Sequence, residues 1–401
     1  MTPPRNSNAV RDIANVLHPY TDAKAHQVNG PLVISRGKGV RIFDEQGKEY
    51  IEAMAGLWCT SLGFDNERLV QAAAMTPIAV DLETVIHRAA EFAALVDGLI
   101  GRERGYHGVG FGGMSVGGIG PNRKQFGALL PYVDHLPHTH LPAKNSYCRG
   151  EPPHGAELAD VLENLVALHG AETIAAVMVE PVAGSTGVLV PPVGYLKRLR
   201  DICTKHGILL IFDEVITGFG RLGANFGAER LGVVPDIMTM AKGLTNAAVP
   251  MGAVAVKNEI YDAIVTGTSA GIEFFHGYTY SGHPLAAAAA IATLELHRAE
   301  DLPGRALALE PYWQDAVHSL KGLPNVIDIR DVGLIGAVEL APRPGKPTQR
   351  ALDVFRRCFD DGVLIRVTAD IIAMSPPLIC EKPHVDRLIN TLAEALVAEA
   401  A

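Results

Sequence analysis

Two short runs of almost uninterrupted apolar residues, separated by a stretch with helical spacing, constrain the fold of this chain more than any other feature. The runs are TIAAVMV at 173–179 and ILLIF at 208–212, and apolar positions recur at helical intervals over 195–203. A strand without polar alternation is typically buried on both faces, and a helix between two such strands connects parallel neighbours. The sequence therefore predicts an α/β fold built on a parallel sheet with helices on its faces.

Other segments extend this prediction along the chain. We expect two more strands of the same sheet at 237–240 and 252–256, followed by a helix at 284–300 that leads out of it. Residues 39–52 alternate around a turn, which predicts a β-hairpin in an N-terminal accessory region. The remaining expected elements, strands at 326–330, 336–340 and 363–367 and helices at 349–360 and 384–399, indicate a smaller α+β domain.

The composition excludes several classes of function. The 401 residues carry 35 basic and 44 acidic side chains, a net charge of −9, without a basic run dense enough to follow a phosphate backbone, so we expect no nucleic-acid partner. The cysteines show neither metal-like spacing nor a disulfide pattern, so we interpret them as ordinary buried thiols and predict no metal site. The longest apolar run, at 285–294, is too short for a membrane span, and residues 1–8 lack the apolar stretch of a secretion signal, so we expect a soluble cytoplasmic protein without membrane contact.

Three reactive residues follow predicted strands. Glu180, Asp213 and Lys242 each lie at or just after the carboxyl end of a strand. In an open α/β sheet, ligands bind beyond these ends, so the three side chains are expected to face one crevice.

The acid and the amine together indicate one cofactor chemistry. A carboxylate such as Asp213, held against a pyridine nitrogen, keeps it protonated, and the ring then accepts the electron pair released when a substrate Cα–H bond breaks. A partly desolvated lysine such as Lys242 has a lowered pKa and can form a Schiff base. The pair predicts a pyridoxal 5′-phosphate enzyme; the structural alternatives are a loop-capping aspartate and a solvated surface lysine.

Further candidates each have an ordinary alternative. Tyr106 can stack on a cofactor ring with His107 supporting it, or the two can be a core tyrosine and a loop histidine. Thr279 precedes a predicted helix, where a hydroxyl suits either a phosphate or a simple N-cap. Arg366 ends a predicted strand, where a guanidinium can bind a substrate carboxylate or lie in solvent. Trp58 is either a core anchor or a wall of the pocket.

Taken together, these segments resemble the class III, fold-type I aminotransferases that use pyridoxal phosphate, and among them the β-alanine (ω-amino acid):pyruvate transaminases. The matching segments are RGYHGVG at 104–110, GIGPNR at 118–123, DHLPHT at 134–139, VEPVAGS at 179–185, the Asp213 and Lys242 motifs and HGYTYSGHP at 276–284. The resemblance covers most of the chain. It implies transfer of an amino group from an ω-amino acid or amine to pyruvate, by a homodimer or a dimer of dimers with shared active sites.

The same resemblance implies the domain organisation. It predicts a large cofactor-binding domain at 61–300, with a mostly parallel central sheet flanked by helices. A smaller α+β domain is expected at 301–401, with residues 1–60 as an N-terminal segment that contributes to it.

Roles at the cofactor ring are also implied by the resemblance. Lys242 is the Schiff-base lysine and Asp213 is the partner of the pyridinium nitrogen. Val215 packs against the ring, and Tyr106 is the stacking aromatic residue with His107 beside it.

The resemblance implies further roles around the phosphate and the substrate. Thr279 reaches the phosphate of the neighbouring subunit's cofactor. Arg366 is the mobile arginine that binds the substrate carboxylate, and Glu180 pairs with it when no acidic substrate is present. The residues expected at the substrate entrance are Leu57, Trp58 and Tyr20.

One segment departs from the family pattern. In the family, a segment containing Gly-Ser opens a helix and binds the cofactor phosphate with backbone N–H groups and a hydroxyl. The corresponding residues here, MTPIAVD at 75–81, lack the Gly-Ser pair and contain Pro77, which has no N–H to donate. Several dozen preceding residues are missing as well, so we expect the large domain to be shortened around 74–101 and the phosphate to depend mainly on Thr279.

Two other functions stay open on the sequence alone. The same scaffold carries racemisation and intramolecular amino transfer, which need no pyruvate. A homologue that has lost its phosphate site can also be a non-catalytic binding protein with impaired cofactor binding.

Overall fold

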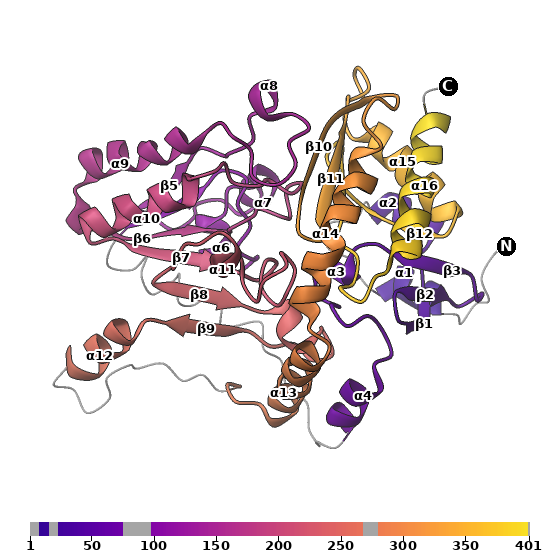
Figure 1. The fold of residues 1–401 in the computed structure, drawn as a ribbon, viewed down its shortest axis with the longest axis horizontal. Helices are drawn as coiled ribbons and strands as arrows, with labels where there is room; N and C mark the ends of the chain where they lie inside the picture. The colour runs from indigo at the N-terminus through magenta and orange to yellow at the C-terminus, as the bar shows by residue number, and fades with distance from the viewer. Residues whose placement is uncertain (1–7, 16–22, 75–97, 268–279, 400–401) are drawn as a thin grey trace.

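The largest sheet of the protein confirms the predicted α/β architecture (Figure 1). The structure, a computed structural model, describes residues 8–15, 23–74, 98–267 and 280–399. Strands β4 to β8 run parallel, while β9 at the edge is antiparallel to β8, which the apolar pattern did not indicate. In spatial order the strands are β5 (Val133–Leu136), β4 (Gly98–Arg102), β6 (Ile174–Val179), β7 (Leu209–Asp213), β8 (Ile237–Met240) and β9 (Ala253–Val256).

Both faces of this sheet are covered, which explains the uninterrupted apolar runs. Along β6, Val177 and Val179 belong to a core shared with two helices on one face, whereas Ala176 and Met178 pack on the opposite face. The predicted helix after β6 ends at Gly207, whose φ of +70° suits a residue without a side chain. The covering helices are α9 (Val161–His169) and α10 (Tyr195–His206) on the first face and α6 (Phe111–Val116) on the second.

A second sheet joins the two ends of the chain. The hairpin predicted at 39–52 is present as β2 (Arg41–Asp44) and β3 (Glu49–Glu52), and β1 (Ile34–Lys38) extends it. Strand β12 (Val363–Leu364), from the C-terminal region, pairs parallel with β3. The N-terminal residues therefore fold together with a segment more than 300 positions away.

A third, antiparallel sheet carries the C-terminal region. The expectation of one strand over 363–367 is wrong, because the chain changes sheets at Ile365: β12 joins β3, whereas the next strand joins β14. Arg366 consequently begins a strand instead of ending one. The sheet consists of β10 (Val326–Val332), β11 (Ile335–Leu340), β14 (Ile371–Met374) and β13 (Arg366–Thr368), with α14 (Leu302–His318), α15 (Gln349–Asp360) and α16 (Lys382–Ala398) beside it.

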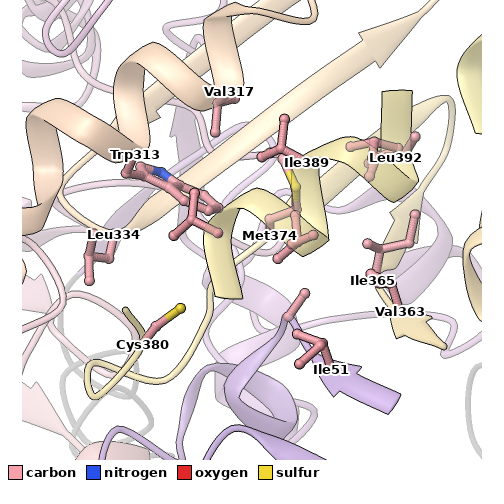
Figure 2. Packing of buried hydrophobic residues seen from close by; sticks show 14 of the residues in the cluster. Ile51, Trp313, Val317, Leu334, Val363, Ile365, Met374, Cys380, Ile389 and Leu392 are labelled. Carbon is pink, nitrogen blue, oxygen red and sulfur yellow. The ribbon is translucent and has the colours of Figure 1, made fainter. Parts of the chain in front are cut away.

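The core of this region includes residues from both ends of the chain. Figure 2 shows Ile51 of β3 near Met374 and Val363, with Trp313 and Ile389 in the same cluster. All are almost completely buried, and apolar burial of this kind contributes roughly 1.5–3 kcal/mol per large side chain. Packing thus fixes the N-terminal hairpin to the C-terminal helices.

A charged cluster connects the C-terminal sheet to the rest of the protein. His140, Asp328 and Glu339 bring possible metal-ligand atoms close together. Arg330 lies among them: its Nη1 is 2.6 Å from Glu339 Oε2 and 3.0 Å from His140 Nε2, and it also donates to Asp328. The guanidinium therefore supplies the positive charge that these carboxylates require.

The remaining helices complete the structure. They are α1 (Asn8–Asn15), α2 (Ala23–Asn29), α3 (Ala55–Trp58), α4 (Glu67–Ala74), α7 (Gly120–Lys124), α8 (Pro142–Asn145), α11 (Gly227–Arg230), α12 (Asn258–Gly267) and α13 (Pro284–Ala299). None of the helices within the described ranges has the length and apolar character needed to cross a membrane. Predictions about Tyr20, Thr279 and residues 75–81 lie outside the described residues.

Candidate active site

The strand ends of the large sheet open into a cavity of about 440 Å³. This volume lies in the range of small-molecule and cofactor pockets. The turn after β3 and the loops after β4, β6, β7 and β8 all contribute to its wall. The sequence candidates that line the cavity are Leu57, Tyr106, His107, Glu180, Asp213, Val215 and Lys242.

Asp213 is the last residue of β7 and is only 3% exposed. Its Oδ2 accepts a hydrogen bond of 2.8 Å from His107 Nδ1, and its Oδ1 accepts one of 3.1 Å from the backbone N–H of Val215. Burial favours the neutral form of His107, but the hydrogen bond and charge of Asp213 outweigh it and raise the pKa of His107. These contacts fix the orientation of a carboxylate that still has lone pairs for another donor.

Glu180 forms a second buried acidic group at the cavity. Burial raises its pKa, while the positive charges of His107 and Arg102 oppose that rise. Arg102 ends β4, donates a 2.9 Å hydrogen bond from Nη2 to the Glu180 carbonyl, and lies 3.7 Å from Glu180 Oε2. Sequence reasoning missed Arg102, although an arginine at the end of the run LIGR, shortly before Tyr106, is a usable signal.

Lys242 lies in the loop after β8 and is partly buried in the cavity wall. Burial lowers its pKa to about 8, the nearby charge of Arg366 adds to this effect, and Asp213, Cys59 and Glu180 oppose it. The backbone of Lys242 has a φ of +49°, an uncommon value for a residue with a side chain. A lysine with this pKa has an appreciable fraction of neutral, nucleophilic amine near neutral pH.

Asn246 anchors the loop that carries Lys242. Its Oδ1 accepts a 2.8 Å hydrogen bond from the N–H of Leu62, and its Nδ2 donates a 3.1 Å bond to the carbonyl of Gly63. The side chain is buried, so both bonds form away from solvent. No sequence pattern identified Asn246, because its partners are more than 180 positions away.

Cys59 lines the same cavity. Burial raises the pKa of its thiol, with Lys242 opposing the shift. The interpretation of all the cysteines as ordinary buried thiols is wrong here, because Cys59 is only half-buried and faces a functional cavity; Cys148 is half-buried too. A single cysteine without a motif carries no sequence signal for such a position.

Two other candidates occupy positions next to the cavity. Trp58 is 2% exposed and packs in a cluster with Val182 and Ile216, which corresponds to the core-anchor alternative. Arg366 is absent from the lining, but its charge acts on Lys242.

The donor set of the cavity fits pyridoxal phosphate at its ring end. Lys242 offers an amine of lowered pKa, Asp213 a fixed carboxylate, and Tyr106 an aromatic face. His107 Nε2 and Glu180 Oε2 are buried without a hydrogen-bond partner among the described residues. The residues expected at the phosphate end lie outside the described part of the chain.

Uptake of the cofactor by the cofactor-free protein is expected to accelerate as the pH rises through about 8. Because burial lowers the pKa of Lys242 to this value, the amine is protonated and unreactive below it and neutral above it. Stopped-flow absorbance at a series of pH values measures the rate, which should level off above the midpoint. A midpoint near 10.5, the ordinary lysine value, would contradict this environment for Lys242.

Sequence comparison identifies relatives over nearly the whole chain. The family model for class-III aminotransferases matches residues 88–396. An omega-aminotransferase from Caulobacter vibrioides is 53% identical over an alignment of 411 positions, gaps included, that covers 91% of this chain and 93% of the relative. A beta-alanine–pyruvate aminotransferase from Pseudomonas aeruginosa is 41% identical, covering 91% and 92%.

Solved structures show the same architecture. A thermostable omega transaminase 6-fold mutant from Pseudomonas jessenii superimposes with a TM-score of 0.89 at 33% identity, covering 98% of both chains. An omega transaminase from the same species in complex with PMP has a TM-score of 0.88 at 32% identity, again over 98% of both. The chain belongs to the class III aminotransferases, fold-type I enzymes that use pyridoxal 5′-phosphate.

Proposed function

We propose that this enzyme transfers an amino group from an ω-amino acid such as β-alanine, or from an amine, to pyruvate. The observation that carries the proposal is the meeting of Lys242 with the Asp213–His107 pair in one cavity. The names of the relatives, an omega-aminotransferase and a beta-alanine–pyruvate aminotransferase, support this substrate class.

The proposed roles follow from the charges in the cavity. When bound, pyridoxal phosphate supplies an electron sink for the carbon from which a proton is removed. Asp213 would offer its negative charge to the ring nitrogen of the bound cofactor, and His107 keeps that carboxylate in one orientation. Lys242 Nζ takes the proton from the substrate carbon that bears the amino group and returns a proton later. Tyr106 and Val215, which line the cavity, limit the access of water to the ring.

Substrate recognition is proposed for residues at the entrance of the cavity and next to it. We propose that Arg366 binds the carboxylate of pyruvate or of the ω-amino acid through its guanidinium fork, and that Glu180 pairs with it in the absence of a carboxylate. The charge of Arg366 already acts on Lys242, which supports its placement near the reacting atoms. Leu57 is proposed at the entrance, with Trp58 supporting it from the core and Tyr20 as a further entrance residue.

The assembly is proposed to be a cytoplasmic homodimer or dimer of dimers. In it, Thr279 reaches the phosphate of the neighbouring subunit's cofactor. Exposed apolar side chains on α13, Ile291 and Leu294, offer surface for such contacts. The proposed units are the large domain at 61–300 and the small domain at 301–401, with residues 1–60 contributing to the latter.

We also propose that the large domain is shortened around 74–101. The alignment with the Caulobacter vibrioides relative spans 411 positions while covering 91% of a 401-residue chain, so the relative has residues without a counterpart here. Such a loss near MTPIAVD is expected to weaken retention of the cofactor.

The purified protein with added pyridoxal phosphate is expected to form alanine from pyruvate and β-alanine. Because the amino group moves in two half-reactions, double-reciprocal plots at several pyruvate concentrations should be parallel. Chromatographic measurement of alanine and of the donor's carbonyl product tests this. Conversion of the donor at an undiminished rate without pyruvate would contradict transamination and indicate racemisation or intramolecular transfer.

A further inference from the structure

Glu52 is a buried carboxylate to which no role has been assigned so far. It is the last residue of β3, and its side chain is only 2% exposed within the apolar stretch YIEAM. Burying a carboxylate is unfavourable unless hydrogen bonds or opposite charges compensate it. Burial raises the pKa of Glu52 to about 7, while the backbone N–H groups of Gly56, Met54 and Ala55 and the charge of Arg221 oppose the rise. Such a residue calls for an explanation beyond packing.

The carboxylate of Glu52 holds the turn that follows β3. Its Oε1 accepts a 3.1 Å hydrogen bond from the N–H of Met54, and its Oε2 accepts one of 2.8 Å from the N–H of Gly56. One side chain therefore satisfies two backbone donors on the inner side of the turn. A neutral amide could accept only one of these bonds without placing its own N–H groups against a donor.

The turn, which coincides with the short element α3 (Ala55–Trp58), needs such support because its backbone is not helical inside and is strained. Ala55, Gly56 and Trp58 have φ values of +48°, +68° and +67°. For alanine and tryptophan this region is unfavourable, and such residues persist where the surroundings determine them. The hydrogen bonds that Met54 and Gly56 donate to Glu52 hold the backbone of the turn in this conformation. The burial of Trp58 in the core holds the other end of the turn.

The strained backbone decides which side chains face the cavity. Leu57, between Gly56 and Trp58, is 53% exposed and lines the cavity together with Cys59 and Lys242. Trp58 points instead into the core cluster. A relaxed turn would rotate these side chains relative to each other, so the part of the cavity wall that Leu57 and Cys59 form depends on the conformation that Glu52 holds.

We propose that Glu52 is a positioning residue that holds Leu57 at the substrate entrance and thereby sets how tightly the amino donor binds. This inference rests on the proposed function for its kinetic consequence, but not for its structural one. Glu52 has no expected contact with the substrate and acts through the turn.

Hydrogen exchange in the cofactor-free protein tests the structural part. At pH 8, where Glu52 is mostly charged, E52Q is expected to raise the exchange of the Met54 and Gly56 amides roughly tenfold, because a hydrogen bond to a charged acceptor is lost. Amides of β7 should stay unchanged. The matched control is E49Q, on the same strand, because the exposed carboxylate of Glu49 contacts the Arg41 side chain at 2.9 Å and makes no other side-chain ion pair in the described part of the chain. Unchanged exchange at the turn of a folded E52Q protein would overturn the proposal.

Steady-state kinetics test the connection to Leu57. E52Q is expected to raise the KM of the amino donor roughly tenfold with kcat within about twofold, since binding is weakened while the reacting groups stay in place. In a L57A background, the same change should have little further effect, because the two residues act through one contact. Additive effects on KM would refute the proposal. E52D keeps the charge, so its Met54 and Gly56 amides should exchange more slowly than those of E52Q. If E52Q does not fold, E52D replaces it in both experiments.

Hydrogen exchange and steady-state kinetics together distinguish a failure of the role proposed for Glu52 from a failure of the proposed function. A wild-type protein that exchanges as expected but has no transaminase activity would contradict the proposed function alone. A wild-type transaminase whose E52Q variant loosens at the turn with an unchanged donor KM would contradict the role of Glu52 at the entrance.

Discussion

Replacing Lys242 with alanine is expected to lower the rate of amino transfer by on the order of 10⁴-fold, the upper range for loss of a positioned proton-transfer group. The variant loses both the amine that binds the cofactor covalently and the base that moves the proton at the substrate carbon. Because the pKa of Lys242 is lowered to about 8, its free amine is present near neutral pH, and no other lysine within the described ranges lines the cavity. Rates should be measured at saturating cofactor, so that weaker binding does not imitate a slower reaction.

The matched control for this prediction is K197A. Lys197 lies on the surface of α10 and, among the described residues, forms an ion pair with Asp201 alone, at 2.9 Å, so its removal should leave the rate unchanged. A small primary amine added to the Lys242 variant should restore part of the rate, because it can replace the missing base in the cavity. Activity of K242A within tenfold of the wild type would exclude Lys242 from the reaction.

The second large effect is expected for Asp213→Asn, with a loss in kcat of roughly 10²- to 10³-fold, as for removal of one preorganised electrostatic contact. Asparagine preserves the size of the side chain but removes the charge that favours a protonated ring nitrogen. The change also removes the charged acceptor of His107, so the raised pKa of this histidine should fall. Kinetics and a histidine NMR titration measure the two consequences.

Asp134 provides the control for Asp213. It lies on β5 of the same sheet and its exposed carboxylate is 2.7 Å from His169 Nε2, which also makes an aspartate–histidine pair, but away from the cavity. D134N is therefore expected to keep its activity. Equal losses in D134N and D213N would indicate a general effect on the sheet and not a role at the cofactor ring.

The strongest parts of the sequence prediction rest on local patterns. The runs at 173–179 and 208–212 are almost free of polar residues, so the sequence predicted strands that are buried on both faces. The charged residues that follow these runs were therefore expected at one edge of the sheet. Asp213, Glu180 and Lys242 do line one cavity in the structure. Their proximity follows from the geometry of a parallel sheet, which needs no information about distant contacts.

Structural features that depend on residues far apart in the chain could not be predicted from the sequence. Strand β9 is antiparallel because of the path of the chain after Lys242, and a short apolar run has no direction. Strand β12 ends where the chain leaves one sheet for another, although the residues around Ile365 read as one strand.

Buried polar residues were missed for the same reason. Arg102 and Glu52 look like ordinary charged residues in the sequence, because their compensation comes from Glu180 and from a strained turn. The position of Cys59 on the cavity wall likewise depends on that turn.

The covalent attachment of the cofactor tests the central claim most directly. The protein loaded with pyridoxal phosphate is treated with borohydride, which makes the link permanent, then digested and mapped by mass spectrometry. The mass of the reduced cofactor is expected on Lys242 and is expected to be absent from K242A. Attachment to a different lysine, or an active enzyme with no modified Lys242, would contradict the assignment of this cavity as the active site.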